Sequence, residues 1–487
     1  MLTRFRSCTG PVTRAFFVGA LVLSAPSLGF AAVDEPAVFP FPRDSLKGFT
    51  KHGIKAEEVS AYAMPVPPYV QRRPQTFALG GRQLVNPASV AKVFTTGLAL
   101  DQLLSTYRFK TGFHAEADPI DGVLRGPLYI KGSGDPGFTT SDLWYSLRML
   151  RTKGVKTIRG NVVLDDSVFS DQGVQLTSDD TEAFDEAPHR AYHAQPYGLL
   201  MNHGSMMIHL ELNQNSVRVV PEEAPQSWAF VSEVRAVSGA CGAWKNSMEV
   251  SFARRGDDVV VTVKGNYPRT CGTSPLPIRV PPQDWLWESW FREIWTQLGG
   301  EFTGQVLKGK TPASTVALYT FHGKQLAEHI KQVNKWSSNV MARHLELAVA
   351  GTPQAFGPKV LGWLATQGVP TPGWVIDNGS GLSRKTLVDP KGLAQFLRNM
   401  AQRPDFPDYL ASFPRAGADG TVRKRMNEVD GYAYLKTGSL SGTRSVAGYV
   451  RAQDRQWWAV AIMVRSPNAA ESWPAMEGVI EFIYRSR

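Results

Sequence analysis

The sequence is poor in cysteine and has no long apolar run beyond its N-terminal segment. Only three of its 487 residues are cysteines, and no later segment is long and apolar enough to span a membrane. The histidines lack the H-E-x-x-H spacing of zinc peptidases, and the basic residues form neither a long run nor a nucleic-acid-binding motif. These absences argue against a multi-span membrane protein, a zinc peptidase and a nucleic-acid-binding protein.

The N-terminal segment has the features of a secretory signal peptide. Arg4, Arg6 and Arg14 precede an apolar stretch from Ala15 to Leu28, and small residues follow it. The alternative is an uncleaved membrane anchor, but the stretch is shorter than the roughly 20 residues that a span needs. We therefore expect residues 1–31 to be removed and the mature protein to be periplasmic.

Removal of this segment leaves two cysteines, Cys241 and Cys271, which we expect to form a disulfide in an exported chain. The alternative, a pair of metal ligands, lacks partners at zinc spacing, so we predict neither a metal nor a cofactor. The formal net charge of the chain is +10, and the basic residues are scattered along the sequence. Such a charge suits peripheral contact with an anionic cell wall or membrane surface. Nothing in the sequence indicates the oligomeric state.

The apolar pattern divides the chain into a strand-rich central part and helical flanks. Short alternating runs between glycines predict strands within residues 107–310, a stretch too long to be a loop. Helical periodicity occurs in three other segments, 88–104, 326–347 and 390–402. We expect an α+β catalytic domain with an antiparallel sheet, made of residues 33–106 and 311–487. Residues 107–310 would then form one or two largely β inserted domains.

A serine and a lysine lie one helical turn apart in Ser89-Val90-Ala91-Lys92, on the same face of a predicted helix. A serine needs an adjacent base to act as a nucleophile, and a lysine can serve if burial or a neighbouring cation lowers its pKa. Near a helix start the Ser89 N–H lacks an intrahelical acceptor and is available to an oxyanion. The pattern alone also fits an ordinary surface helix.

A second motif, Lys436-Thr437-Gly438, follows an apolar run and fits the edge of a strand. There the lysine and the threonine hydroxyl could hold a carboxylate, and Gly438 would let a substrate backbone approach closely. The N–H of Ser439 could complete the oxyanion site. The alternative is an exposed strand end with a turn glycine.

A third motif, Ser337-Ser338-Asn339, lies in or near the predicted helix over 326–347. We interpret Ser337 as a proton relay and Asn339 as the group that orients the lysine and the substrate amide. By itself this triplet carries almost no information.

Together and in this order, the three motifs resemble the signatures of the serine penicillin-recognising enzymes. Residues 377–384 (DNGSGLSR) are similar to the D-G-S-G-L-S-R signature of the D-Ala-D-Ala carboxypeptidase/endopeptidase family, the class C low-molecular-mass penicillin-binding proteins of the penicillin-binding protein 4 type. Residues 413–421 and 435–448 also resemble that family. Two positions depart from its usual pattern, since Asn378 is interposed in the signature and Ser338 occupies the middle of the third motif.

The length of the chain between the motifs agrees with this resemblance. About 245 positions separate Lys92 from Ser337, which leaves room for the two inserted domains of the family. A compact class A β-lactamase has a far shorter gap. The resemblance therefore implies a penicillin-binding, serine β-lactamase-like catalytic fold interrupted by an insert.

The resemblance also implies an activity, the cleavage of peptidoglycan stem peptides by a serine D-Ala-D-Ala carboxypeptidase/endopeptidase that β-lactams acylate. Ser89 would be the acylated nucleophile and Lys92 its base. Ser337 would pass a proton to the departing D-alanine nitrogen, and Lys436 with Thr437 would hold the terminal carboxylate.

Two further residues are carried over from the family. Arg384 resembles the arginine that touches the substrate side chain, and Asp165, in the insert, would contact the amine end of the peptide. Gly132–Gly137 matches G-x-G-x-x-G, but its surroundings lack a parallel βαβ unit, so we expect a turn there.

Two other functions remain open at this point. A β-lactamase would share the acylation step, but the sequence has no E-x-x-L-N segment to activate the deacylating water. A catalytically weak envelope-binding scaffold would keep the fold without the chemistry.

Overall fold

The computed structural model describes residues 37–70, 75–80, 83–170, 187–214, 216–280 and 282–486. The predicted signal peptide, residues 1–31, lies outside the described residues. Within these ranges no helix has the length and apolar character that crossing a membrane would require. The chain combines helices with several sheets, which confirms the predicted α+β class.

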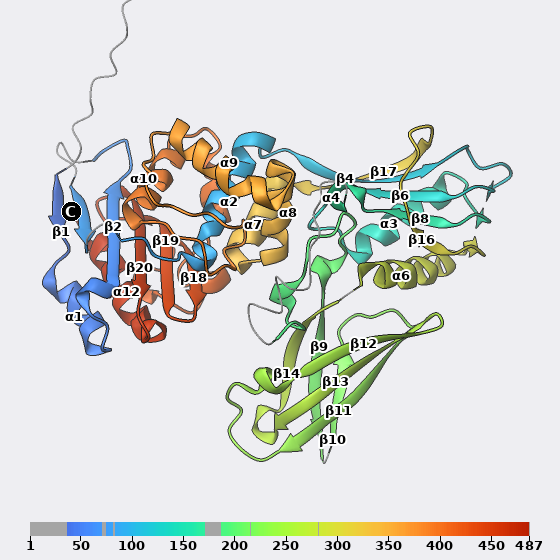
Figure 1. Ribbon diagram of the computed structural model, residues 1–487, viewed down its shortest axis with the longest axis horizontal. Helices are drawn as coiled ribbons and strands as arrows, with labels where there is room; N and C mark the ends of the chain where they lie inside the picture. Colours follow the sequence, from blue (N-terminus) through green and yellow to red (C-terminus); the bar gives the residue numbers. More distant parts are fainter. Residues whose placement is uncertain are drawn as a thin grey trace, which may run out of the picture. The chain divides into compact units, whose positions relative to one another are not determined.

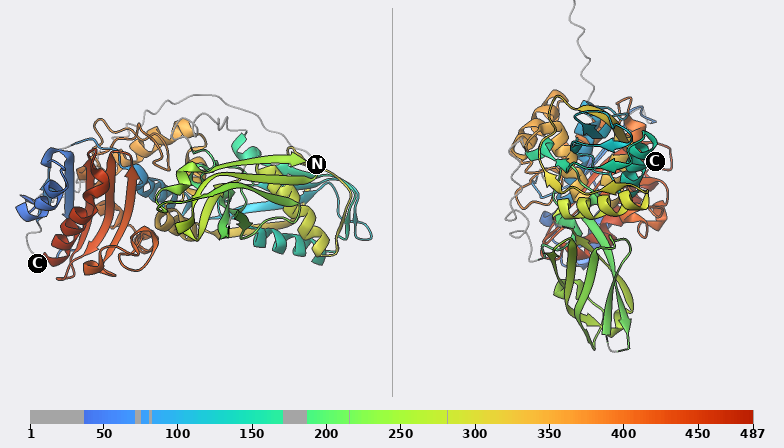
Figure 2. Two further views of the ribbon diagram at one scale, coloured as in Figure 1. Left: turned by 90° about the horizontal axis from the view of Figure 1, so that it is seen from below. Right: turned by 90° about the vertical axis from the view of Figure 1, so that its right-hand side faces the viewer.

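Both ends of the described chain contribute to one six-stranded sheet, where the blue N-terminal and red C-terminal segments lie side by side in Figure 1 and Figure 2. In spatial order its strands are β1 (Val38–Pro40), β3 (Thr76–Leu79), β2 (Val59–Pro65), β20 (Trp457–Arg465), β19 (Thr443–Arg451) and β18 (Ala433–Leu440). Strand β2 pairs antiparallel with β20 and so joins the two ends of the chain. Strand β18, with the Lys-Thr-Gly motif, lies at the edge of the sheet, as its sequence predicted.

Apolar side chains bury both faces of this sheet. Along β20, Ala461 and Met463 belong to one buried cluster, whereas Ile462 and Val464 belong to another. This alternation follows from the period of two in a strand, and it explains why the strand is apolar throughout. The helices that cover the two faces are α10 (Pro390–Met400) on one side, and α12 (Trp473–Arg485) with α1 (Arg43–Lys51) on the other.

A group of helices beside the sheet holds two of the three sequence motifs. These helices are α2 (Lys92–Leu103), α7 (Leu326–Trp336), α8 (Asn339–Ala350), α9 (Pro353–Thr366) and α11 (Phe406–Ser412). The helix predicted over 88–104 is present, but its first turn, η2 (Ala88–Ala91), is a 3-10 helix. Residues 92–100 are all buried, so α2 is the central helix of the group.

The single helix predicted over 326–347 is in fact two helices. Ser337 has a φ of 60° and ends α7 in the left-handed conformation. The next residue, Ser338, caps α8, because its hydroxyl accepts a hydrogen bond from the Met341 N–H at 3.4 Å. The apolar periodicity did not reveal this break, since both helices bury one face in the same core.

The central part of the chain is rich in strands. One of its sheets has the spatial order β16 (Val306–Lys308), β8 (Val162–Asp165), β6 (Leu128–Gly132), β4 (Arg108–Ala115) and β17 (Val316–Gln325). A second has the order β15 (Glu301–Phe302), β7 (Thr157–Ile158) and β5 (Val123–Leu124). A third has the order β10 (Ser216–Pro221), β9 (Ser205–Asn213) and β14 (Thr273–Arg279), and a fourth has the order β11 (Trp228–Val237), β13 (Asp258–Pro268) and β12 (Glu249–Arg255). Among the described residues, the helices that accompany these sheets are α3 (Thr140–Thr152), α4 (Ser167–Ser170) and α6 (Gln283–Gln297).

This central part has its own buried apolar cluster, drawn from residues between Phe113 and Leu318. Strand β17 pairs with β4 and lies beyond residue 310, so the sheet includes a strand from outside the predicted insert. Cys241 and Cys271 form a disulfide within this part of the chain.

Candidate active site

The Lys92 amine is the centre of the site. Its Nζ lies 3.0 Å from Ser89 Oγ and 2.7 Å from Asn339 Oδ1, and it also contacts the carbonyl oxygen of Ser380. A neutral amine has two N–H bonds and one lone pair. The Asn339 and Ser380 oxygens can only accept hydrogen bonds, so they occupy the two N–H groups. The lone pair then faces Ser89, the one neighbour of the three that can donate a proton.

The surroundings of Lys92 favour this neutral form. Its side chain is fully buried. Burial, and then the charge of Lys436, lower the pKa of Lys92 well below 10.5. The sequence analysis named burial and a neighbouring cation as alternative causes of a lowered lysine pKa, and both act on Lys92.

The second lysine, Lys436, contacts the serine of the third motif. Its Nζ donates to Ser337 Oγ at 2.9 Å and to the Thr437 carbonyl oxygen at 2.8 Å. Ser337 lies in the turn between α7 and α8, in the left-handed conformation. Burial lowers the pKa of Lys436 to about 7. The two lysines and two serines therefore form two hydrogen-bonded pairs, drawn from η2, α2, β18 and the α7–α8 turn, and the charge of Lys436 acts on Lys92.

Gly438 is required by the protein's own backbone. A Cβ at this position would lie 2.2 Å from Ser445 Oγ and 2.4 Å from the Pro87 carbonyl oxygen. The glycine thus lets the edge strand β18 approach the turn that carries Ser89, rather than leaving space for a substrate as its sequence context suggested. Ser439, the next residue, is exposed on this edge.

The loop that contains the Ser380 carbonyl is shaped by Asn378, the residue that departs from the family signature. Its Oδ1 accepts from the Ser380 N–H at 3.1 Å and the Gly381 N–H at 2.9 Å. Gly381 has a φ of +69°, and a Cβ there would lie 2.1 Å from the Ala88 carbonyl oxygen. Sequence reasoning did not identify Ser380 as a site residue, because its contact with Lys92 uses the backbone.

Glu346, on α8, supports the same loop and was also missed. Its Oε2 accepts from the Gly379 N–H at 2.8 Å, directly before Ser380. The side chain is almost fully buried, and burial raises the pKa of Glu346 to about 7. The sequence shows that Glu346 follows Asn339 within one predicted helix. It does not indicate which face of that helix the carboxyl group occupies.

A backbone group from the central part of the chain contacts the site. Asn339 Nδ2 donates to the Tyr192 carbonyl oxygen at 3.0 Å. Nearby, His344 on α8 contacts the Gly134 carbonyl oxygen at 2.8 Å and the Tyr197 N–H at 3.3 Å. The segment Gly132–Gly137 therefore packs against an active-site helix. It forms no helix N-terminus, in agreement with the turn predicted for it.

Two predicted residues, Arg384 and Asp165, remain to be described. Arg384 is exposed at the end of the 377–384 loop. Asp165 is only 1% exposed, and its oxygens accept from the Ser167 N–H at 3.1 Å and the Thr311 N–H at 2.7 Å. Burial would raise the pKa of Asp165, but these hydrogen bonds lower it below its ordinary value. The carboxylate thus holds local backbone together.

The chain is similar in sequence to a known protein family and to characterised relatives. Residues 75–483 match the model of the D-Ala-D-Ala carboxypeptidase 3 (S13) family. The chain is 30% identical to the D-alanyl-D-alanine carboxypeptidase DacB of Haemophilus influenzae over 393 residues, which is 76% of this chain and 78% of that protein. It is also 30% identical to the D-alanyl-D-alanine carboxypeptidase of Actinomadura sp. strain R39, over 76% of this chain and 71% of that protein.

Solved structures show the same fold. The crystal structure of penicillin binding protein 4 from Haemophilus influenzae superposes with a TM-score of 0.73 and 23% identity, over 91% of this chain and 98% of that chain. A second structure of that protein, complexed with a β-lactam, superposes with a TM-score of 0.70. The predicted penicillin-binding fold is thereby confirmed.

Proposed function

Because the chain belongs to the D-Ala-D-Ala carboxypeptidase 3 (S13) family, and is therefore a serine D-alanyl-D-alanine carboxypeptidase, we propose that Ser89, Lys92 and Ser337 carry out its chemistry. The observation that supports this assignment best is the set of contacts at the Lys92 amine. Two acceptors occupy its N–H groups and leave the lone pair to Ser89. This is the arrangement that a general base needs.

In the acylation step, Ser89 Oγ attacks the carbonyl carbon between the two D-alanines while its proton moves to Lys92 Nζ. The oxyanion would be held by the N–H groups of Ser89 and Ser439. A C–O bond to Ser89 forms and the C–N bond breaks. The departing nitrogen receives a proton through Ser337, whose hydroxyl contacts the Lys436 amine. Water then attacks the acyl-enzyme and restores Ser89.

The substrate carboxylate would be held by Lys436 and Thr437 at the edge of the sheet. Since the pKa of Lys436 is about 7, an approaching carboxylate favours its charged form. Asn339 would bind the substrate amide with the side chain that also orients Lys92. We keep Arg384 as a contact to the substrate side chain and Asp165 as a contact to its amine end.

The natural substrates would be peptidoglycan stem peptides, cut at a terminal D-alanine or at a cross-link, because both reactions share one acylation step and differ in the amine that leaves. A β-lactam would acylate the same serine; the related penicillin binding protein 4 has been crystallised with one. We also propose that the protein is exported to the periplasm and that residues 107–310 form its inserted domains.

The test is labelling of the mature protein with fluorescent penicillin beside a Ser89→Ala control, followed by mass analysis. We expect a stable adduct on Ser89 of the wild type alone. An adduct on both proteins would disprove the assignment of Ser89. Release of the penicilloyl group within seconds would show a β-lactamase instead.

A further inference from the structure

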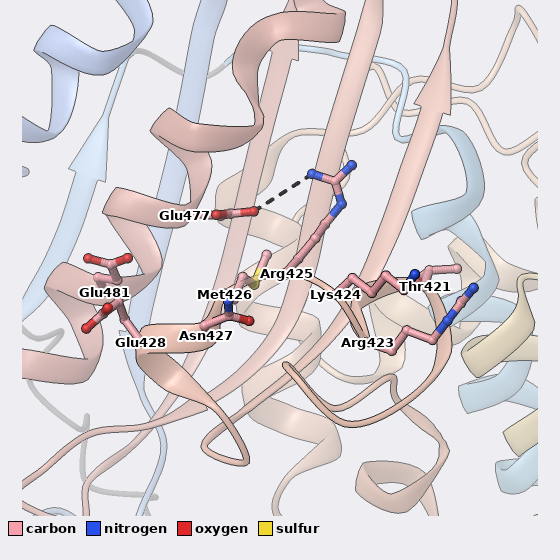
Figure 3. A pocket seen from close by; sticks show the side chains of 9 residues that line it. All are labelled: Thr421, Arg423, Lys424, Arg425, Met426, Asn427, Glu428, Glu477 and Glu481. Atoms are coloured by element: carbon pink, nitrogen blue, oxygen red, sulfur yellow. Dashed lines mark ion pairs between the residues drawn. The ribbon is translucent and has the colours of Figure 1, made fainter. Parts of the chain in front are cut away.

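A pocket of about 630 Å³ opens beside the Lys-Thr-Gly edge of the active site. Its lining residues are Thr421, Arg423, Lys424, Arg425, Met426, Asn427, Glu428, Glu477 and Glu481 (Figure 3). Thr421 joins the pocket to the site, because its hydroxyl accepts a hydrogen bond from Thr437 Oγ1 at 2.9 Å. The pocket therefore begins directly behind the group proposed to hold the substrate carboxylate.

The acidic residues of the pocket are already paired with arginines. Glu477 lies 3.8 Å from Arg425, the ion pair drawn in Figure 3. Glu428 and Glu481 both pair with Arg485, at 3.6 and 3.5 Å. The carboxylates at the end of the pocket away from Thr421 are thus each paired with an arginine of the protein, two of them with the same Arg485.

Two cations at the other end have no such partner. Among the described residues, neither Arg423 nor Lys424 forms an ion pair with a carboxylate, and both are exposed. Figure 3 shows Arg423 close to Thr421, at the end of the pocket opposite Glu428 and Glu481. The uncompensated positive charge of the pocket is therefore concentrated beside the active site.

Arg423 is also held in place. Its Nη1 donates to the Gly420 carbonyl oxygen at 3.0 Å. Its guanidinium lies over the ring of Trp336 at 6.0 Å, and Trp336 is 55% exposed directly before Ser337. A cation fixed in this way loses little conformational freedom when it binds an anion.

The position of the pocket defines which part of a substrate would reach it. With the carboxylate of the departing residue on Lys436 and Thr437, the pocket that begins at Thr421 would be within reach of a large group attached to that residue. A departing free D-alanine carries only a methyl group. In a cross-link the departing residue is attached to a second stem peptide, which carries further carboxylates.

We propose that Arg423 and Lys424 form a subsite for a carboxylate on the departing strand of a cross-linked stem peptide. The subsite makes the enzyme prefer cross-links to uncross-linked D-alanyl-D-alanine ends. This inference rests on the proposed function, since it places the departing residue by the roles given to Ser89, Lys436 and Thr437.

The test compares two substrates with the same acyl donor, a cross-linked muropeptide dimer and a monomeric pentapeptide. The quantity measured is the ratio of their kcat/KM values. In the double variant Arg423→Ala/Lys424→Ala we expect the dimer-to-monomer ratio to fall about tenfold, through KM, because exposed charge pairs contribute modestly each. The matched control is Arg148→Ala/Lys153→Ala, which removes two exposed cations from α3 and its end and should keep the ratio.

A second substrate sharpens the result. A dimer whose departing strand has its carboxylates converted to amides should react alike with the wild type and the double variant. An unchanged ratio in the double variant, or an equal loss for carboxylate and amide dimers, would overturn the subsite. Failure of the proposed function is seen separately, because penicillin would then leave Ser89 unlabelled in the wild type as well.

Discussion

Lys436 should oppose folding while it serves the reaction, and the size of this effect follows from its burial. The side chain is fully buried, and burial lowers its pKa from 10.5 to about 7. Between these two values the unfolded chain binds a proton that the folded chain does not. Stability therefore rises with pH across this window. The destabilisation is complete below about pH 7 and absent above about pH 10.5.

The magnitude comes from about 1.4 kcal/mol for each unit of pKa difference. At pH 8 the buried lysine destabilises the fold by roughly 3 kcal/mol, and at pH 10.5 by less than about 0.5 kcal/mol. Lys436→Met keeps the length of the side chain and removes the amine. The variant also loses the hydrogen bonds to Ser337 and Thr437, but this loss varies little with pH, because a neutral amine can still donate both.

The measured quantity is thus the difference in unfolding free energy between the variant and the wild type as a function of pH. We expect this difference to change by about 3 kcal/mol between about pH 8 and about pH 10.5, in favour of the wild type at the higher pH. Hydrogen exchange of peptides from β18 to β20 at increasing urea concentration reports the stability of this sheet directly. Lys51→Met, an exposed lysine at the end of α1, is the control.

A difference that stays constant over this pH range would refute the reasoning. It would mean that Lys436 keeps its proton in the folded protein. The same variant should lose carboxypeptidase activity at every pH, so stability and activity separate in one experiment.

Three further predictions follow from the described contacts. Lys92→Ala should lower the rate of penicillin acylation about a thousandfold without lowering the melting temperature, as measured by stopped-flow fluorescence and thermal melting. Gly438→Ala should destabilise the protein by more than about 2 kcal/mol and abolish acylation, because its Cβ would lie within 2.4 Å of a backbone carbonyl; Gly478→Ala, with open space around it, should not. Replacing Cys241 and Cys271 by serine should lower the local stability of residues 205–280 by about 3–4 kcal/mol, given their separation of 30 positions, and leave acylation intact; urea unfolding followed by limited proteolysis checks this.

The motif residues could be predicted from sequence because each pair lies within one turn or one strand. Ser89 and Lys92 are one turn apart in any helix, and that spacing brings their side chains together. The edge position of β18 followed from its apolar run and its glycine. The role of Gly438 could not be predicted from the sequence, because it depends on the close approach of Pro87 from another part of the chain.

The rest of the Lys92 environment could not be predicted, because it comes from distant backbone. The Ser380 carbonyl is 288 positions away in the sequence, and a carbonyl group leaves no trace in residue identity. The turn that presents it depends on Asn378, which the sequence comparison marked only as a departure from a pattern. Asp165 is a site residue that only the family resemblance suggested, and its buried oxygens also accept hydrogen bonds from backbone N–H groups, which its residue type does not indicate.

The protonation states of the two buried lysines, Lys92 and Lys436, depend on each other. A charge on Lys436 lowers the pKa of Lys92, so the two amines do not readily hold protons together. The groups around each amine determine which of the two lysines carries the charge. Lys92 faces a serine hydroxyl and two acceptors, with no anion among these contacts, whereas Lys436 lies at the sheet edge where the substrate carboxylate would bind. Carboxylate binding would place the proton on Lys436, and the resulting charge would keep Lys92 neutral at the moment when Ser89 needs a base.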